Sequence, residues 1–212
     1  MSNVIQYILP FLPELFLAFG ASQLLAFGVG GKTDRTNIVR YVAIGLLIAF
    51  AFIGLIAGVP GVDAFKGALV NDKLSYISKT ILGMSAAAAL LLSADYLKSE
   101  KFDKYEFSIL VLYAVLGMSI MVSSNSLLSL YIGIEMQSLA LYVLAAFNRD
   151  SLRASEAGLK YFVLGAISSG LLLYGISLVY GFTGTISYNG IAQAVASGNS
   201  CLLYTSPSPR DA

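Results

Sequence analysis

Long apolar stretches recur along the whole chain, and short charged loops separate them. Each stretch is close to the ~20 residues that an α-helix needs to cross the hydrocarbon core of a bilayer. The pattern predicts six membrane-spanning helices, at approximately residues 5–29, 38–57, 76–97, two within 107–147, and 157–181. The only polar break in 107–147 is Ser-Ser-Asn-Ser at 123–126, which predicts a very tight turn between two helices.

The predicted spans are helical because isolated strands would leave backbone polar groups unpaired in hydrocarbon. A membrane barrel would need alternating segments of about ten residues, and the sequence contains none. The beginning of the chain lacks the basic region and small-residue cleavage site of a secretory signal, so the first stretch is expected to remain as a span. The predicted fold class is an all-α, polytopic transmembrane helix bundle.

The composition supports a lipid environment and excludes several kinds of function. Hydrophobic residues make up 57% and charged residues 12% of the 212 residues, and the mean hydropathy is +0.78. The net charge of +1 excludes a basic surface for nucleic acid, and the absence of His removes histidine-based catalysis and metal binding. The single cysteine, Cys201, excludes a disulfide framework, an iron–sulfur cluster and a cysteine-rich zinc site within this chain.

Basic residues concentrate in alternate loops, which predicts the orientation in the membrane. One side carries Lys32, Arg35, Arg40, Lys98, Lys101, Lys104, Arg149 and Arg153. The other side carries Lys66, Lys73 and, counted generously, Lys79. The richer side is expected to face the cytoplasm, with the N-terminus on the outer side.

The loops and the tail suggest a division of the chain. Residues 62–73 mix apolar and charged side chains, which fits a short amphipathic surface helix or an ordinary solvated loop. Residues 1–105 are expected to hold the first three spans, and residues 106–200 the next three. Residues 201–212 (CLLYTSPSPRDA) turn polar and proline-rich where another span is expected, and are interpreted as a non-native tail.

Glu135 lies near the middle of the fifth predicted span, with no cation among its sequence neighbours. An ionisable group at the bilayer centre costs about 2.5–3.5 kcal/mol on insertion scales, so it calls for an explanation. One explanation is a protonated carboxyl that bonds to a neighbouring helix. The other is a switchable proton site, whose proton affinity changes as a cation approaches or withdraws.

Lys160 is the second candidate, and it lies about one turn inside the predicted start of the sixth span. It could extend to the interface and pair with Glu156, four residues earlier on the same helix face. Glu135 is expected ~18 Å from the cytoplasmic end of its helix and Lys160 only ~6 Å inside the next helix. A direct ion pair between them is therefore not expected, although a water-linked chain of titratable groups could include both.

Three other charged residues fall within predicted spans. Glu14 is expected to be an interfacial or helix-packing carboxylate rather than a transport residue. Lys79 and Asp95 lie near the ends of the third span, where extension of their side chains to the interface accounts for both.

Three segments carry a resemblance to a known family: residues 116–123 (LGMSIMVS), 130–147 (LYIGIEMQSLALYVLAAF) and 156–162 (EAGLKYF). They resemble subunit N of proton-translocating NADH–quinone oxidoreductase, the respiratory complex I, and the run EMQSLALY is specific among its antiporter-like subunits. The resemblance covers essentially residues 1–200. It implies that Glu135 corresponds to the proton-channel glutamate of the fifth helix and Lys160 to the lysine of the sixth.

The resemblance also implies what lies outside this chain. Family members continue with a broken seventh helix, whose lysine partners the glutamate, and with a second, inverted repeat, so the chain is expected to be an N-terminal fragment. Its expected partners are the other membrane subunits of complex I and the lipid bilayer. NADH, FMN, iron–sulfur clusters and quinone are expected on other subunits, and no cofactor or metal on this one.

Two alternatives remain for the function. A multisubunit cation/proton antiporter shares the glutamate and lysine pattern without a redox partner. A membrane scaffold subunit would use the buried charges only to fix helix packing. Replacement of Glu135 would separate a pump from a scaffold, because only the scaffold should lose assembly.

Overall fold

The computed structural model describes residues 11–30, 35–56, 62–64, 67–100 and 102–197. Within them the chain forms seven helices and one two-stranded antiparallel hairpin, whose bounds are α2 (Leu12–Val29), α3 (Thr36–Ile56), β1 (Val62–Ala64), β2 (Leu69–Asn71), α4 (Lys73–Ser99), α5 (Tyr105–Ser123), α6 (Leu127–Ala145), α7 (Leu152–Thr183) and α8 (Tyr188–Ala196). Six of these helices, all except α8, are long and apolar enough to cross a membrane. The predicted all-α bundle is confirmed.

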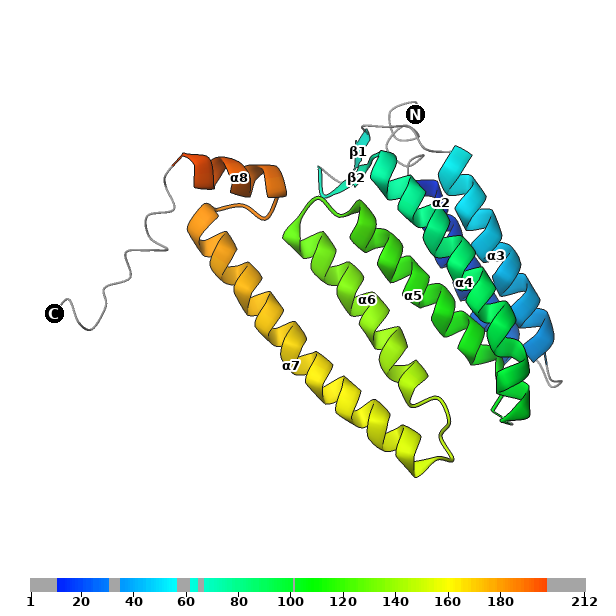
Figure 1. Ribbon diagram of the computed structural model, residues 1–212. Coiled ribbons are helices and arrows are strands. Elements are labelled where there is room, and N and C mark those ends of the chain that lie inside the picture. The colour runs from blue at the N-terminus through cyan, green and yellow to red at the C-terminus, as the bar shows by residue number, and fades with distance from the viewer. Residues whose placement is uncertain (1–10, 31–34, 57–61, 65–66, 101, 198–212) are drawn as a thin grey trace.

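The spanning helices run roughly parallel or antiparallel to one another, with α3, α4, α5, α6 and α7 side by side and α2 behind α4 in this view (Figure 1). The buried core comes from α2, α3, α4 and α5, and it includes Leu17, Leu47, Phe50, Leu90 and Leu112. Helix α6 packs on α5, and α7 packs on α6. Only Gly158 and Ile176 of α7 are buried, so α7 forms an open edge of the bundle.

The predicted tight turn between the fourth and fifth spans is confirmed. Helix α5 ends at Ser123 and α6 begins at Leu127, and the Ser126 hydroxyl caps α6 by accepting a hydrogen bond from the Ser129 amide at 3.1 Å. Glycines then allow the two helices to touch. A Cβ atom on Gly117 would lie 2.8 Å from the carbonyl oxygen of Gly133, so the backbones of α5 and α6 are in direct contact there.

The sequence left a short amphipathic helix or a solvated loop open at 62–73, and the helix is wrong, because strands β1 and β2 lie in that segment. Val62 pairs with Asn71 and Ala64 with Leu69, and Gly67 in the turn has a φ of 81°, which a helix does not accommodate. The Asn125 side chain donates to the Gly67 carbonyl at 2.9 Å. The hairpin is thus attached to the α5–α6 turn, a contact between segments distant in the sequence.

Asp72 follows the hairpin directly and caps α4. Its carboxylate accepts hydrogen bonds from the Ser75 hydroxyl at 2.6 Å and from the Ser75 amide at 2.7 Å. These two bonds lower the pKa of Asp72 from its ordinary value of 3.8, and the bond from the Ser75 hydroxyl has the larger effect. Because the folded pKa lies below the unfolded one, the stabilisation is present at neutral pH and is lost as the pH falls through the folded pKa.

We expect Asp72→Ala to lower the stability of the protein by about 1 kcal/mol at neutral pH, because the first turn of α4 loses its capping acceptor. Thermal unfolding in detergent at neutral and at strongly acidic pH measures the effect. The difference from the unsubstituted protein should shrink in acid. Asp72→Asn, which keeps a capping oxygen, is the control, and equal melting of all three proteins at neutral pH would contradict the prediction.

At the opposite end of the bundle, charged residues connect neighbouring helices. Arg40 of α3 pairs with Asp103, just before α5, and the two side chains are only 4% and 15% exposed. The Arg35 guanidinium lies 4.3 Å from the centre of the Phe27 ring and donates to the Phe27 carbonyl at 3.2 Å. These contacts hold α2, α3 and α5 together at the end where basic residues concentrate.

Candidate functional site: the interface of α6 and α7

Glu135 lies near the middle of α6, eight residues after its first residue and ten before its last. At 1.5 Å per residue this places it ~12 Å from one end of the helix and ~15 Å from the other. Its carboxylate accepts a hydrogen bond from the hydroxyl of Ser169 on α7, and the residue is half-buried. The carboxyl group is thus at membrane depth and has a polar partner, as a proton site requires.

A groove between α6 and α7 extends from this hydrogen bond toward the end of α6. It has a volume of ≈ 490 Å³, and its walls include Ser138, Tyr142, Ser168 and Ser169. Hydroxyl groups therefore follow one another along an otherwise apolar helix interface. Such groups both donate and accept hydrogen bonds, so they suit a path for protons.

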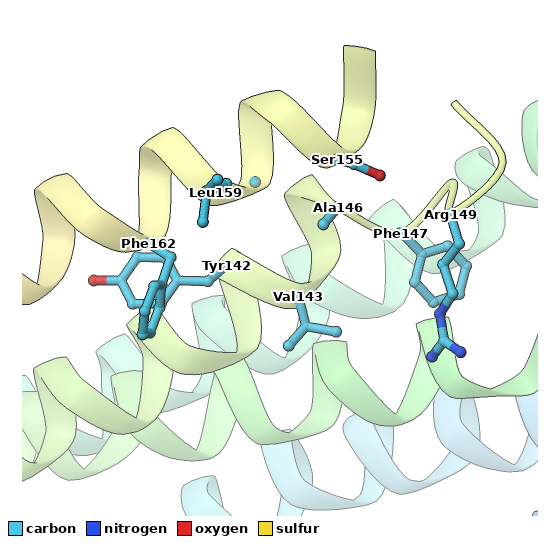
Figure 2. Close-up of a pocket in the computed structure, with 9 residues that line it drawn as sticks. Tyr142, Val143, Ala146, Phe147, Arg149, Ser155, Leu159 and Phe162 are labelled. Atoms are coloured by element: carbon cyan, nitrogen blue, oxygen red, sulfur yellow. The ribbon is translucent and has the colours of Figure 1, made fainter. Parts of the chain in front are cut away.

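Tyr142 stands at the end of this groove. Its ring packs edge to face against Tyr161 and Phe162, with centroids 4.8 and 5.7 Å apart, and its hydroxyl lies against Gly165, where any side chain would collide with it. Beyond Tyr142 a second pocket of ≈ 440 Å³ opens near the end of α6 (Figure 2), with Arg149 and Ser155 among its lining residues. Tyr142 lines both spaces.

Lys160 is close to this interface but does not contact Glu135. Its ammonium pairs with Glu156 at 2.5 Å, and the two side chains are 70% and 59% exposed. The pairing expected within one helix is confirmed. Ser169, the partner of Glu135, is nine residues further along α7, or ~13 Å along its axis.

Lys160 lies further from the start of its helix than predicted, because α7 begins at Leu152 rather than near 157. Lys160 is therefore ~12 Å rather than ~6 Å from the start of its helix. With 32 residues α7 is ~48 Å long, whereas the hydrocarbon core is ~30 Å thick. Part of α7 must extend beyond the core, so an exposed Lys160 is compatible with a position near the interface.

One charged residue has a different position from the one predicted. Lys79 does not extend to the interface, since its side chain is 1% exposed and its ammonium pairs with Glu14 of α2 at 2.6 Å. The Glu14 side chain is 10% exposed, so it lies inside the bundle rather than at the interface. The sequence contains one signal that could have revealed the pair, namely opposite charges about one turn inside two spans at the same membrane side.

The described residues contain no group of three or more His, Cys, Asp or Glu side chains that could hold a metal ion. The chemistry available at the α6–α7 interface is therefore that of one carboxyl group, several hydroxyls and a nearby ammonium.

Comparisons with known proteins find similarity over the part of the chain that contains this interface. A family model described as "NADH:quinone oxidoreductase/Mrp antiporter, TM" matches residues 124–206, which include α6 and α7. NADH-quinone oxidoreductase subunit N of Maricaulis maris is 57% identical over 189 residues, and that of Rhodospirillum rubrum is 51% identical over 189 residues. These matches cover 89% and 88% of this chain, and 39% of each relative.

Solved structures share the fold. A chain of "Respiratory complex I from Thermus thermophilus with bound Aureothin" superposes with a TM-score of 0.70 at 27% identity, over 90% of this chain and 42% of the other. A chain of an archaeal membrane-bound sulfane sulfur reductase superposes with a TM-score of 0.66 at 21% identity, which shows a common fold only. This chain is thus similar to NADH-quinone oxidoreductase subunit N over most of its own length and spans about two fifths of the length of the curated relatives it matches.

Proposed function

We propose that the full-length protein is a proton-translocating membrane subunit of an NADH–quinone oxidoreductase, and that Glu135 and Lys160 belong to its proton path. The observation that carries the proposal is the hydrogen bond from Ser169 to a carboxyl group at mid-membrane depth, between two helices of a chain similar to subunit N. A charged group at that depth is expensive and is ordinarily kept for ion or proton transfer.

The proposed mechanism is electrostatic. Quinone reduction elsewhere in the complex moves positive charge along a row of lysines and glutamates. When a cation withdraws from Glu135, the carboxylate takes up a proton, and when the cation returns, the proton is expelled. Ser169 stabilises the charged form between these events by donating its hydrogen bond.

The proposed route to Glu135 runs along the α6–α7 interface. The pocket beside Arg149 opens at the end where basic residues concentrate, and the groove that contains Ser138 and Ser168 leads on to Ser169. Tyr142 lines both spaces, so its hydroxyl would lie on this route. Lys160, on the same helix as Ser155 and Ser169, lies near the entrance in its ion pair with Glu156.

The partners and the membrane location of the protein follow from this role. The partners are other membrane subunits of complex I and the lipid of a bacterial inner membrane, with the N-terminus outside and the basic loops in the cytoplasm. The chain takes part in the oxidoreductase reaction without a redox centre of its own. NADH, FMN, iron–sulfur clusters and quinone bind to partner subunits.

Purification of the full-length protein from its native membrane tests the proposal against the alternative of a cation/proton antiporter, which the description of the matching family also names. We expect NADH–quinone oxidoreductase activity to co-purify with the protein. Purification with other membrane subunits but without that activity, together with cation-dependent proton exchange, would favour the antiporter.

We expect Ser169→Ala in the full-length protein to slow proton transport by the order of tenfold or more. A hydrogen bond to a charged group contributes ~1.5–3 kcal/mol, and its loss leaves the Glu135 carboxylate without its partner on α7. Transport in proteoliposomes, normalised to the amount of assembled complex, measures the effect. Ser169→Thr keeps the hydroxyl and should retain most of the rate.

Ser85→Ala is the matched control, because the Ser85 hydroxyl on α4 is exposed and bonds only to the carbonyl of Leu82 on its own helix, at 3.1 Å. If Ser169→Ala transports as fast as Ser85→Ala, Ser169 has no part in the path.

A further inference from the structure

The ion pair of Glu14 and Lys79 is a second buried site, away from the α6–α7 interface. Lys79 is six residues inside α4, or ~9 Å from its first residue, and Glu14 is in the first turn of α2. Both residues are more than nine-tenths buried. The pair lies at the end of the bundle that bears the hairpin, opposite to the basic loops.

The Lys79 ammonium has two acceptors. It is 2.6 Å from Glu14 Oε1 and 3.5 Å from the Asn71 side-chain oxygen on β2, and it lies 5.6 Å from the centre of the Phe11 ring. A cation between two acceptors can shift from one to the other with little change in its own solvation. Such a shift toward Asn71 would leave the carboxylate of Glu14 less well compensated.

The Glu14 carboxylate depends on this one cation. Its contact with Lys79 is short but does not have hydrogen-bond geometry, and neither oxygen has a hydrogen-bond donor among the described residues. A buried carboxylate without donors is stabilised only by nearby positive charge. Its charge state should therefore respond to the position of Lys79.

Helix packing alone does not explain the pair. Helices α2 and α4 each pack mainly on α3 and α5 rather than on each other. Buried ion pairs can often be replaced by apolar residues of similar volume without loss of stability. A purely structural contact would not need two charges in this position.

The other charges near the pair are few. Asp72, exposed at the start of α4, is close enough to Lys79 for an electrostatic interaction. The only charged residue of α3, Arg40, and the only charged residue of α5, Glu106, lie near the opposite end of the bundle. Lys73, exposed at the first residue of α4, is the other cation of this helix at the same end, and Lys79 is the buried cation that contacts Glu14.

We propose that Glu14 and Lys79 form a second proton-exchange site, in a different place from Glu135 and near the outer end of the bundle. On uptake an O–H bond forms on Glu14 and gives a neutral carboxylic acid beside the Lys79 ammonium. On release the same bond breaks and the ion pair is restored. The exposed start of α4 is about 9 Å from Lys79 along the helix axis, and water at this end supplies the proton on uptake and receives it on release.

Infrared difference spectroscopy on the full-length protein in its complex, acidified from alkaline pH, tests for this site. The spectrum should gain a carboxylic-acid C=O band that Glu14→Gln abolishes and that persists in Glu135→Gln and in Glu100→Gln, a substitution at an exposed helix end. Glu14→Asp should keep the band at a shifted position. The infrared measurement does not require that the protein pumps protons. A negative result would therefore contradict this second site without contradicting the proposed function.

The double variant Glu14→Gln, Lys79→Met distinguishes a proton site from a structural clamp, because it removes both charges and leaves no unpaired ion. We expect unchanged abundance of the complex and proton transport slower by the order of tenfold. Wild-type transport, or an acidification spectrum that is identical in Glu14→Gln and the unsubstituted protein, would overturn the proposal. If the double variant does not assemble, the Glu14→Asp spectrum decides: a shifted band supports the site and an unchanged spectrum refutes it.

Discussion

Full-length protein with Glu135→Gln should lose nearly all of its proton pumping, by the order of a hundredfold, while the complex assembles in normal amounts. Glutamine has almost the same shape, and its side-chain oxygen can still accept the hydrogen bond from Ser169. It cannot take up and release a proton, and the loss of a positioned acid or base typically costs at least ~10²-fold. The measurement is the ratio of protons translocated to electrons transferred in sealed vesicles.

Glu100→Gln makes the same chemical change at the exposed end of α4 and serves as the control. It should pump normally. An unaltered proton-to-electron ratio in Glu135→Gln would refute the role assigned to Glu135, and a loss of assembled complex in that variant alone would favour a scaffold.

The six spans could be predicted because their signal is local. A run of about 20 apolar residues must be helical in lipid whatever it packs against, and the Ser-Ser-Asn-Ser break between α5 and α6 can only form a turn. Glu135 was recognisable for the same reason, since a carboxyl group inside such a run requires no knowledge of its neighbours. Its role in transport and that of Lys160 stay predictions.

The partners of these charges could not be predicted, because they come from other helices. Ser169 is an unremarkable residue in α7 until α7 packs on α6 and brings its hydroxyl to Glu135. Lys79 was expected at the interface because its long side chain could reach water. The fold instead supplied Glu14 from α2, and pairing in the interior replaced extension to the surface.

The structure of residues 62–73 could not be predicted for a related reason. Its mixture of apolar and charged residues fits a short amphipathic helix as well as a hairpin, and so short a segment has little intrinsic preference. The hydrogen bonds from Asn125 to Gly67 and Ala68 favour the hairpin, and they exist only after the α5–α6 turn has formed. Tertiary contacts thus determine that this segment forms a hairpin.

Gly117→Leu should prevent normal accumulation of the protein. A Cβ atom at this position would lie 2.6 Å from the backbone nitrogen of Gln137 and 2.8 Å from the carbonyl oxygen of Gly133, so α6 would have to move away from α5. Overpacking typically costs 1–3 kcal/mol, occasionally more, and here the obstacle is backbone that cannot change rotamer. The gain in helix propensity on replacing glycine is at most ~1 kcal/mol, so the collision dominates.

The matched control is Gly45→Leu on α3, where an added Cβ meets nothing within 4 Å. This variant gains helix propensity without a collision and should accumulate and melt at least as well as the unsubstituted protein. The amount of protein in the membrane and its thermal unfolding in detergent compare the two variants. Glu135 is two residues after Gly133, so a displacement of α6 away from Gly117 would also move Glu135 from its place beside Ser169. Equal behaviour of the two leucine variants would show that this close helix contact is dispensable.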